Sequence, residues 1–118
     1  MLQQGFVAHL PFEFVNLDFD RVERIEFVFK LKDSPRAEAF KTAVWYLGQD
    51  SDIVFRSSED ENVLVVSWTR EETYIVPIGS TFYFQSRIHF KDSPVEPQTP
   101  IVPIVMDGSL FAEGEEYV

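Results

Sequence analysis

Residues 24–32 read Arg-Ile-Glu-Phe-Val-Phe-Lys-Leu-Lys, and this stretch decides the fold class. Its apolar residues fall on alternate positions, at Ile25, Phe27, Phe29 and Leu31. The positions between them carry Glu26, Lys30 and Lys32, with Val28 as the one apolar exception. A period of two is that of a β-strand with one face on a core and the other in water. The stretch therefore predicts a half-buried strand.

The same alternation continues along the chain. In residues 81–91 one face carries Phe82, Phe84, Ile88 and Phe90, and the other carries Tyr83, Gln85, Arg87, His89 and Lys91. Residues 62–68 form a run rich in β-branched valine, with Leu64, Val66 and Trp68 on one side. Weaker strands are expected over 6–15, 52–57 and 100–106, and the prolines of the first and last suit edge strands. Residues 37–47 fit a helical stripe or a strand, and the short connections favour a strand.

Turn and cap residues separate these segments. Thr69-Arg70-Glu71-Glu72 matches a capping box and predicts one helical turn over 70–74, closed by Pro77-Ile78-Gly79. Turn signals recur about every 10 residues, a spacing typical of sandwiches and barrels. The sequence therefore predicts an all-β fold: one antiparallel, immunoglobulin-like β-sandwich domain of about seven strands over residues 1–118, with 107–118 forming an acidic C-terminal arm.

One tetrapeptide occurs twice. Lys-Asp-Ser-Pro stands at 32–35 and again at 91–94, each time after a strand that contains Arg-Ile-x-Phe. Asp and Ser side chains bond to nearby backbone N–H groups, and Pro ends a ladder. We favour the interpretation that the same type of turn simply occurs twice. The alternatives are an internal duplication or a paired recognition loop.

Charge and composition exclude several classes of protein. The chain of 118 residues holds 20 acidic and 10 basic residues, a net charge of −10, so we expect no nucleic-acid ligand. Residues 1–58 carry a net −2 (7 bases, 9 acids) and residues 59–118 a net −8 (3 bases, 11 acids). Cys is absent, so no thiolate site or disulfide exists. No apolar run is long enough for a membrane span, and no signal peptide is expected.

The sequence contains few candidate catalytic or metal-binding residues. His9 and His89 are the natural groups that titrate near neutral pH, and His89 is expected to be a solvated residue on the polar face of its strand. No triad or glycosidase pattern surrounds them, so neither an enzyme nor a cofactor is predicted. The weak Ca²⁺ candidates flank one short strand: Asp50, Asp52, Glu59, Asp60 and Glu61. A solvated acidic loop is the favoured reading of these five residues.

Aromatic residues suggest a binding surface. Trp68 continues a core face, and one of Trp45 and Tyr46 should be exposed because strand neighbours point oppositely. Tyr83 should be exposed beside Arg87, a common interface composition. The acidic tail also contains residues with apolar surface that suit contact with a partner, namely Leu110, Phe111 and Tyr117. This tail is read either as a frayed terminus, which we favour, or as an arm that docks on a partner.

Residues 62–111 resemble small hypothetical proteins encoded by bacterial prophages. The shared pattern is the run 63–68, the corner Thr69-Arg70-Glu71-Glu72-Thr73, the strand after Gly79, the run 101–105 and Leu110-Phe111. It also resembles immunoglobulin-like domains of phage baseplate proteins. The resemblance implies a non-enzymatic virion structural or accessory protein, made in the bacterial cytoplasm, that binds other virion proteins or itself through a sheet edge and the tail. The alternative is a carbohydrate- or Ca²⁺-binding β-sandwich module.

Overall fold

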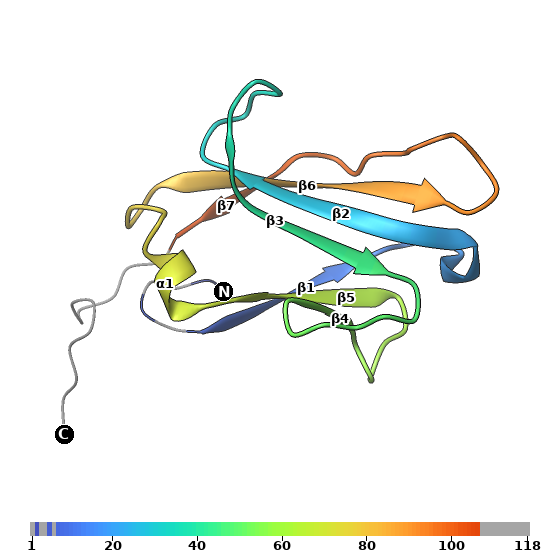
Figure 1. Cartoon of the computed structure of the whole chain (residues 1–118). Helices are drawn as coiled ribbons and strands as arrows, with labels where there is room; N and C mark the ends of the chain where they lie inside the picture. Colours follow the sequence, from blue (N-terminus) through green and yellow to red (C-terminus); the bar gives the residue numbers. More distant parts are fainter. Residues whose placement is uncertain (1, 3–4, 6, 107–118) are drawn as a thin grey trace.

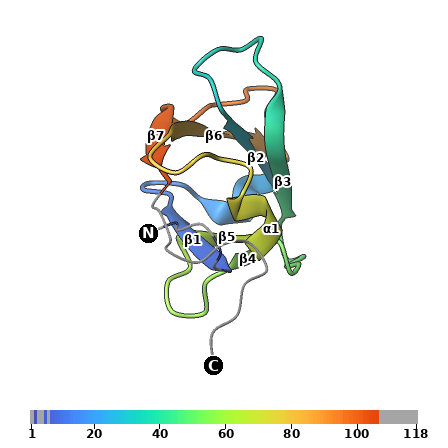
Figure 2. The same ribbon diagram turned by 90° about the vertical axis from the view of Figure 1, so that its left-hand side faces the viewer.

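The computed structural model describes residues 2, 5 and 7–106 of the chain, and they form two antiparallel sheets. One sheet has the order β1-β5-β4, and the other has the order β3-β2-β6-β7. Their faces stack as a sandwich (Figures 1 and 2). The strands are β1 (Ala8–Glu13), β2 (Val22–Lys30), β3 (Ala39–Tyr46), β4 (Val54–Arg56), β5 (Val63–Trp68), β6 (Thr81–Phe90) and β7 (Val102–Val105). The helical turns are η1 (Phe19–Arg21) and α1 (Arg70–Thr73). The all-β sandwich, the strand over 39–46 and the helical corner are confirmed.

Aromatic rings fill the space between the sheets. Alternate residues of β2 and β6 face inward, among them Phe27, Phe29 and Phe82, all of which are buried. Phe12 of β1 stacks on Phe84 of β6 with ring centroids 4.1 Å apart, and this contact joins the two sheets. Burial of such rings removes a large apolar area from water and gives the sandwich its stability.

The helical corner forms through its predicted capping box. The hydroxyl of Thr69 accepts the backbone N–H of Glu72 at 3.2 Å, and the carboxylate of Glu72 accepts the backbone N–H of Thr69 at 2.8 Å. The other Glu72 oxygen lies 2.7 Å from Nζ of Lys41, whose side chain is only 4% exposed. The corner therefore also neutralises a cation that β3 carries into the interior.

Two of the four sheet edges carry an outward-facing proline. Phe14 donates to the carbonyl of Asn62, so alternate residues of β1 face β5 and Pro11 faces the open edge. Met106 donates to the carbonyl of Ser80, and by the same alternation Pro103 faces the open edge of β7. Proline has no N–H to offer, so both edges oppose the addition of another strand.

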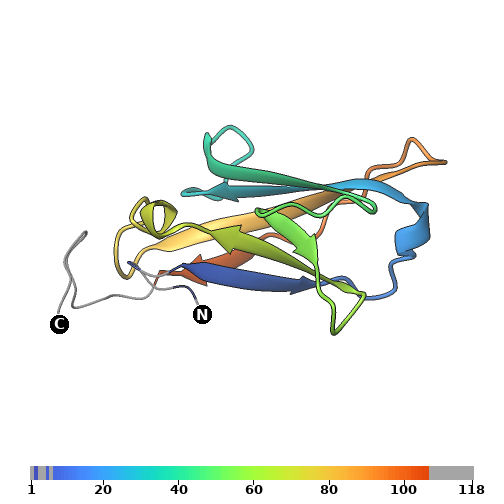
Figure 3. The same cartoon turned by 60° about the horizontal axis from the view of Figure 1, so that its bottom comes forward.

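The other two edges are protected from the addition of another strand in different ways. Strand β4 lies at the edge of its sheet, beside β5 (Figure 3). There, the backbone N–H of Ser51 bonds to the carbonyl of Val54, and the Asp50 carboxylate accepts the N–H of Arg56. On β3, the ladder is interrupted by a bulge opposite Phe29/Lys30, and Gln49 bonds to the carbonyl of Tyr46. Strand addition is therefore disfavoured at every edge of the described sheets, and the faces are left for binding.

The repeated tetrapeptide folds in a similar way in both places. The hydroxyl of Ser34 accepts the N–H of Arg36, and the hydroxyl of Ser93 accepts the N–H of Val95. Strands β2 and β6 are antiparallel neighbours, so the turns that follow them lie at opposite ends of the sheet (Figure 1). The two turns cannot line one site. This separation favours the interpretation that the same type of turn simply occurs twice.

The expected burial of Leu31 is wrong. Strand β2 ends at Lys30, and the chain turns at once because Ser34 bonds to the carbonyl of Lys32. Leu31 therefore extends past the facing sheet and is 43% exposed.

A candidate protein-binding groove

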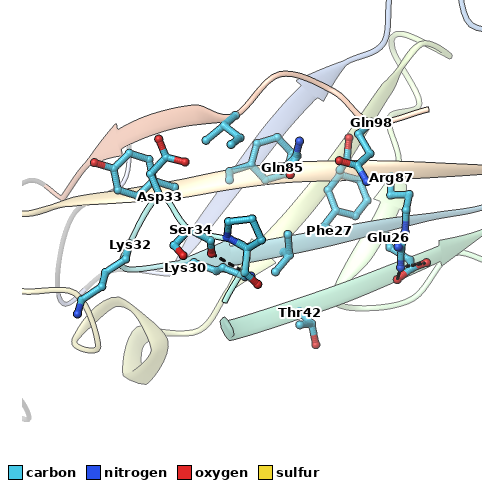
Figure 4. Close-up of a pocket in the computed structure, with 16 residues that line it drawn as sticks. Glu26, Phe27, Lys30, Lys32, Asp33, Ser34, Thr42, Gln85, Arg87 and Gln98 are labelled. Atoms are coloured by element: carbon cyan, nitrogen blue, oxygen red, sulfur yellow. Dashed lines mark hydrogen bonds and ion pairs between the residues drawn. The ribbon is translucent and has the colours of Figure 1, made fainter. Parts of the chain in front are cut away.

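A groove of about 450 Å³ lies on the outer face of the β3-β2-β6-β7 sheet. Its floor consists of outward-facing residues at alternate positions of β2 and β6, and its walls are the loops after β2 and before β7 (Figure 4). The outward-facing lining residues are Glu26, Val28, Lys30, Thr42, Tyr83, Gln85 and Arg87, and the loops add Lys32, Asp33, Ser34, Pro35, Gln98 and Ile101. The groove thus collects side chains from three strands and two loops.

One wall is held to β6 like an extra strand. Ile88 donates its backbone N–H to the carbonyl of Pro97 at 2.9 Å, and Thr99 donates to the carbonyl of Ser86 at 3.0 Å. The side-chain amide of Gln85 also donates to the carbonyl of Thr99 at 2.9 Å. These bonds fix the wall, so the groove is preformed rather than induced.

A charged cluster lies at one end of the groove. The Arg87 guanidinium donates to both Glu26 oxygens, at 3.1 and 3.2 Å. His89 contacts the same carboxylate through Nε2, and its Nδ1 lies 3.1 Å from Oε1 of Glu96. Partial burial would raise the pKa of Glu26, but the hydrogen bonds from Arg87 and His89 hold that pKa below its ordinary value.

The expected solvation of His89 is wrong. His89 is on the outward face of β6 as predicted, but only 7% of it is exposed. The segment that carries Glu96 and Pro97 pairs alongside this part of the strand, and the Glu96 carboxylate contacts the imidazole. A contact from a loop thus helps to bury a residue that strand periodicity assigns to water.

Cations gather at the opposite end of the groove (Figure 4). Nζ of Lys30 donates to the carbonyls of Ser34 and Pro35, at 3.4 and 3.1 Å. Lys32 and Arg36 follow within the same segment. Among the described residues, Lys30, Lys32 and Arg36 have no carboxylate partner. Asp33 lies in the same segment and offsets one of these three charges, so this end stays net positive within an acidic protein.

The predicted partner-binding residues divide into two groups. Tyr83 and Arg87 both line the groove, with Arg87 exposed and Tyr83 half-buried. Leu110, Phe111 and Tyr117 lie outside the described residues. The other aromatic predictions hold, because Trp45 and Trp68 are buried while Tyr46 is exposed.

Two of the five acidic residues considered for Ca²⁺ make other contacts. Asp50 accepts the indole N–H of Trp45 at 2.9 Å and the backbone N–H of Arg56 at 3.0 Å. Asp60 accepts the backbone N–H of Asn62, closing the hairpin that also contains Glu59 and Glu61. Across the described part of the chain, Asp52 and the others join no group of three or more His, Asp or Glu side chains that could hold a metal ion.

Sequence reasoning missed one polar pair on the opposite sheet. Nδ1 of His9 on β1 lies 2.8 Å from the hydroxyl of Ser67 on β5, because the register places the two residues opposite each other. They stand 58 positions apart in the chain, so no local motif could reveal the pair. His9 is exposed, and its ring also lies edge-on to Phe55.

Comparison of the chain with protein-family models, with curated proteins and with solved structures gives no match. No helix within the described residues has the length and apolar character needed to cross a membrane.

Proposed function

We propose that this protein is a non-enzymatic β-sandwich that binds a protein partner through the outer-face groove, as a structural or accessory component of a phage particle. The observation that carries the binding proposal is the preformed groove of about 450 Å³ that contains both Tyr83 and Arg87. Tyrosine and arginine are enriched in protein interfaces. The assignment to a phage particle is supported by the resemblance of residues 62–111 alone.

The character of the groove favours binding over catalysis. Its Arg87 and Glu26 neutralise each other, and the buried His89 contacts Glu96 of the loop. General acid–base catalysis requires a group within hydrogen-bond reach of the proton that it moves, and His89 is only 7% exposed. A protein partner is preferred to a sugar because both tryptophan rings, the largest flat faces on which a sugar could stack, are buried.

The partner contact is assigned to the face of the sheet. Prolines at 11 and 103, together with the closed edge of β4 and the bulged edge of β3, oppose strand addition. The groove is therefore a better candidate for the partner contact than the sheet edge that the resemblance implies.

The proposal is tested in particles purified from an induced culture of the bacterium that carries the gene. Quantitative mass spectrometry should find the protein at a fixed copy number relative to the particle's major proteins. Complementation with Tyr83→Ala should lower that copy number, because this side chain lines the groove. Tyr46→Ala is the matched control, since Tyr46 is an exposed tyrosine of the same sheet and does not line the groove. Absence of the wild-type protein from the particles would refute the assignment to a virion.

A further inference from the structure

The positive end of the groove needs an anionic neighbour. Lys30, Lys32 and Arg36 stand within seven residues, and Lys30 and Lys32 line the groove itself. Among the described residues, the cations of the nearby strands are satisfied by carboxylates, as Arg87 is by Glu26 and Lys41 by Glu72. The three cations of residues 30–36 have no such partner among the described residues, and Asp33 in the same segment offsets only one of their charges, although the whole chain carries a net charge of −10.

The described chain ends beside this positive end. Val105 pairs with Thr81, and Tyr83 of β6 pairs with both Pro103 and Lys30. The end of β7 and the end of β2 therefore lie at the same end of the sheet, with one strand between them (Figure 1). Adjacent strands are about 4.8 Å apart, so Lys30 lies roughly 10 Å from Pro103.

The rest of the chain has the complementary chemistry. Residues 107–118 hold four acids, at Asp107, Glu113, Glu115 and Glu116, and no base. They also hold Leu110, Phe111 and Tyr117, which suit the apolar part of the groove at Val28 and Ile101. Twelve residues reach at most about 40 Å when extended, which exceeds the distance that the groove requires.

We propose that residues 107–118 dock into the outer-face groove of the same chain, with their acids toward Lys30, Lys32 and Arg36. The inference goes beyond the proposed function, because it gives the groove an occupant that a partner must displace. Docking within one chain is favoured over docking on a second copy because a short tether gives a high effective concentration. The contact is electrostatic at its positive end and weakens as salt screens the charges.

The absence of cysteine from the chain allows a direct test by disulfide trapping in the full-length protein. One variant combines Ala112→Cys in the tail with Thr42→Cys, an exposed groove residue. The control combines Ala112→Cys with Ser67→Cys, on the outer face of the opposite sheet. Under a mild oxidant, the 42–112 pair should form an intramolecular disulfide roughly tenfold faster than the 67–112 pair.

Charge substitutions separate docking from chance encounters. Lys30→Gln with Lys32→Gln should remove most of the preference for the 42–112 pair, because glutamine keeps a donor but not the charge. Lys91→Gln is the control, since Lys91 is an exposed cation at the other end of β6, and it should leave the preference intact. Equal rates for the two cysteine pairs, or disulfides only between two chains, would overturn the inference. Neither result would affect the proposed binding of a partner, which the particle assay measures separately.

Discussion

Nδ1 of His89 lies 3.1 Å from Oε1 of Glu96, and this contact ties the loop after β6 to the outer face of the sheet. The same imidazole touches the Glu26 carboxylate through its other nitrogen. One buried ring thus connects a groove residue of β2 to the loop that forms the groove wall. The shape of the groove depends on this connection, so His89 is a positioning residue for the binding surface.

Replacement of His89 by Ala should destabilise the protein by about 1–3 kcal/mol, because it removes a buried ring together with its polar contacts to Glu26 and Glu96. The change is measured by urea unfolding. His9→Ala is the matched control, since His9 is exposed and its loss should cost less than about 0.5 kcal/mol. Equal losses for the two variants would contradict the role given to His89.

Stability should fall in acid through Glu26. The pKa of Glu26 is lowered in the folded protein, so its contribution is complete above its unfolded pKa and is lost as pH falls through the lower folded value. Glu26→Gln should therefore be less stable than wild type at about pH 7, and this difference should shrink as pH falls below the ordinary glutamate pKa of about 4.3. Denaturant titrations over this range give the measurement. A difference that does not change with pH would show that the carboxylate charge is unimportant.

The capping box and the interior ion pair can be separated by two substitutions. Thr69→Ala removes one cap and should cost about 1 kcal/mol. Glu72→Ala removes the reciprocal cap and also leaves the buried Lys41 ammonium without its carboxylate, so its cost should be about 3 kcal/mol or more. Thermal and urea unfolding measure both values. The account fails if Thr69→Ala is the more damaging change.

The edge prolines should keep the wild-type protein from associating through its edges. Pro103→Val restores an N–H donor at the open edge of β7, so it should promote concentration-dependent association. Pro94→Val is the control, because Pro94 is an exposed proline of the loop outside the named strands. Size-exclusion chromatography with light scattering reports the mass. A Pro103→Val variant whose mass does not change with concentration would contradict this role of the proline.

The local parts of the fold could be predicted from the sequence. Alternation in residues 24–30 and 81–90 places the core faces, and the Thr69–Glu72 capping box acts over four residues. The groove depends on distant pairings that no local pattern contains. Glu26 and Arg87 stand 61 residues apart and meet only because β2 pairs with β6.

The burial of His89 has the same kind of cause. Strand periodicity states which face a side chain is on, and it does not state whether a later segment will cover that face. Residues 97–99 bond along β6, and the Glu96 carboxylate contacts the imidazole. Tyr83 and Arg87 could be selected from the sequence as neighbours on an outward face, whereas the walls around them could not.

The central claim is that the groove at Tyr83 and Arg87 binds a protein of the phage particle. The most direct measurement is the copy number of Tyr83→Ala, relative to Tyr46→Ala and wild type, in particles purified from complemented cultures. The account predicts that Tyr46→Ala matches wild type while Tyr83→Ala is depleted several-fold, with both variants equally stable in solution. Particles that contain the two variants in equal amounts would contradict it.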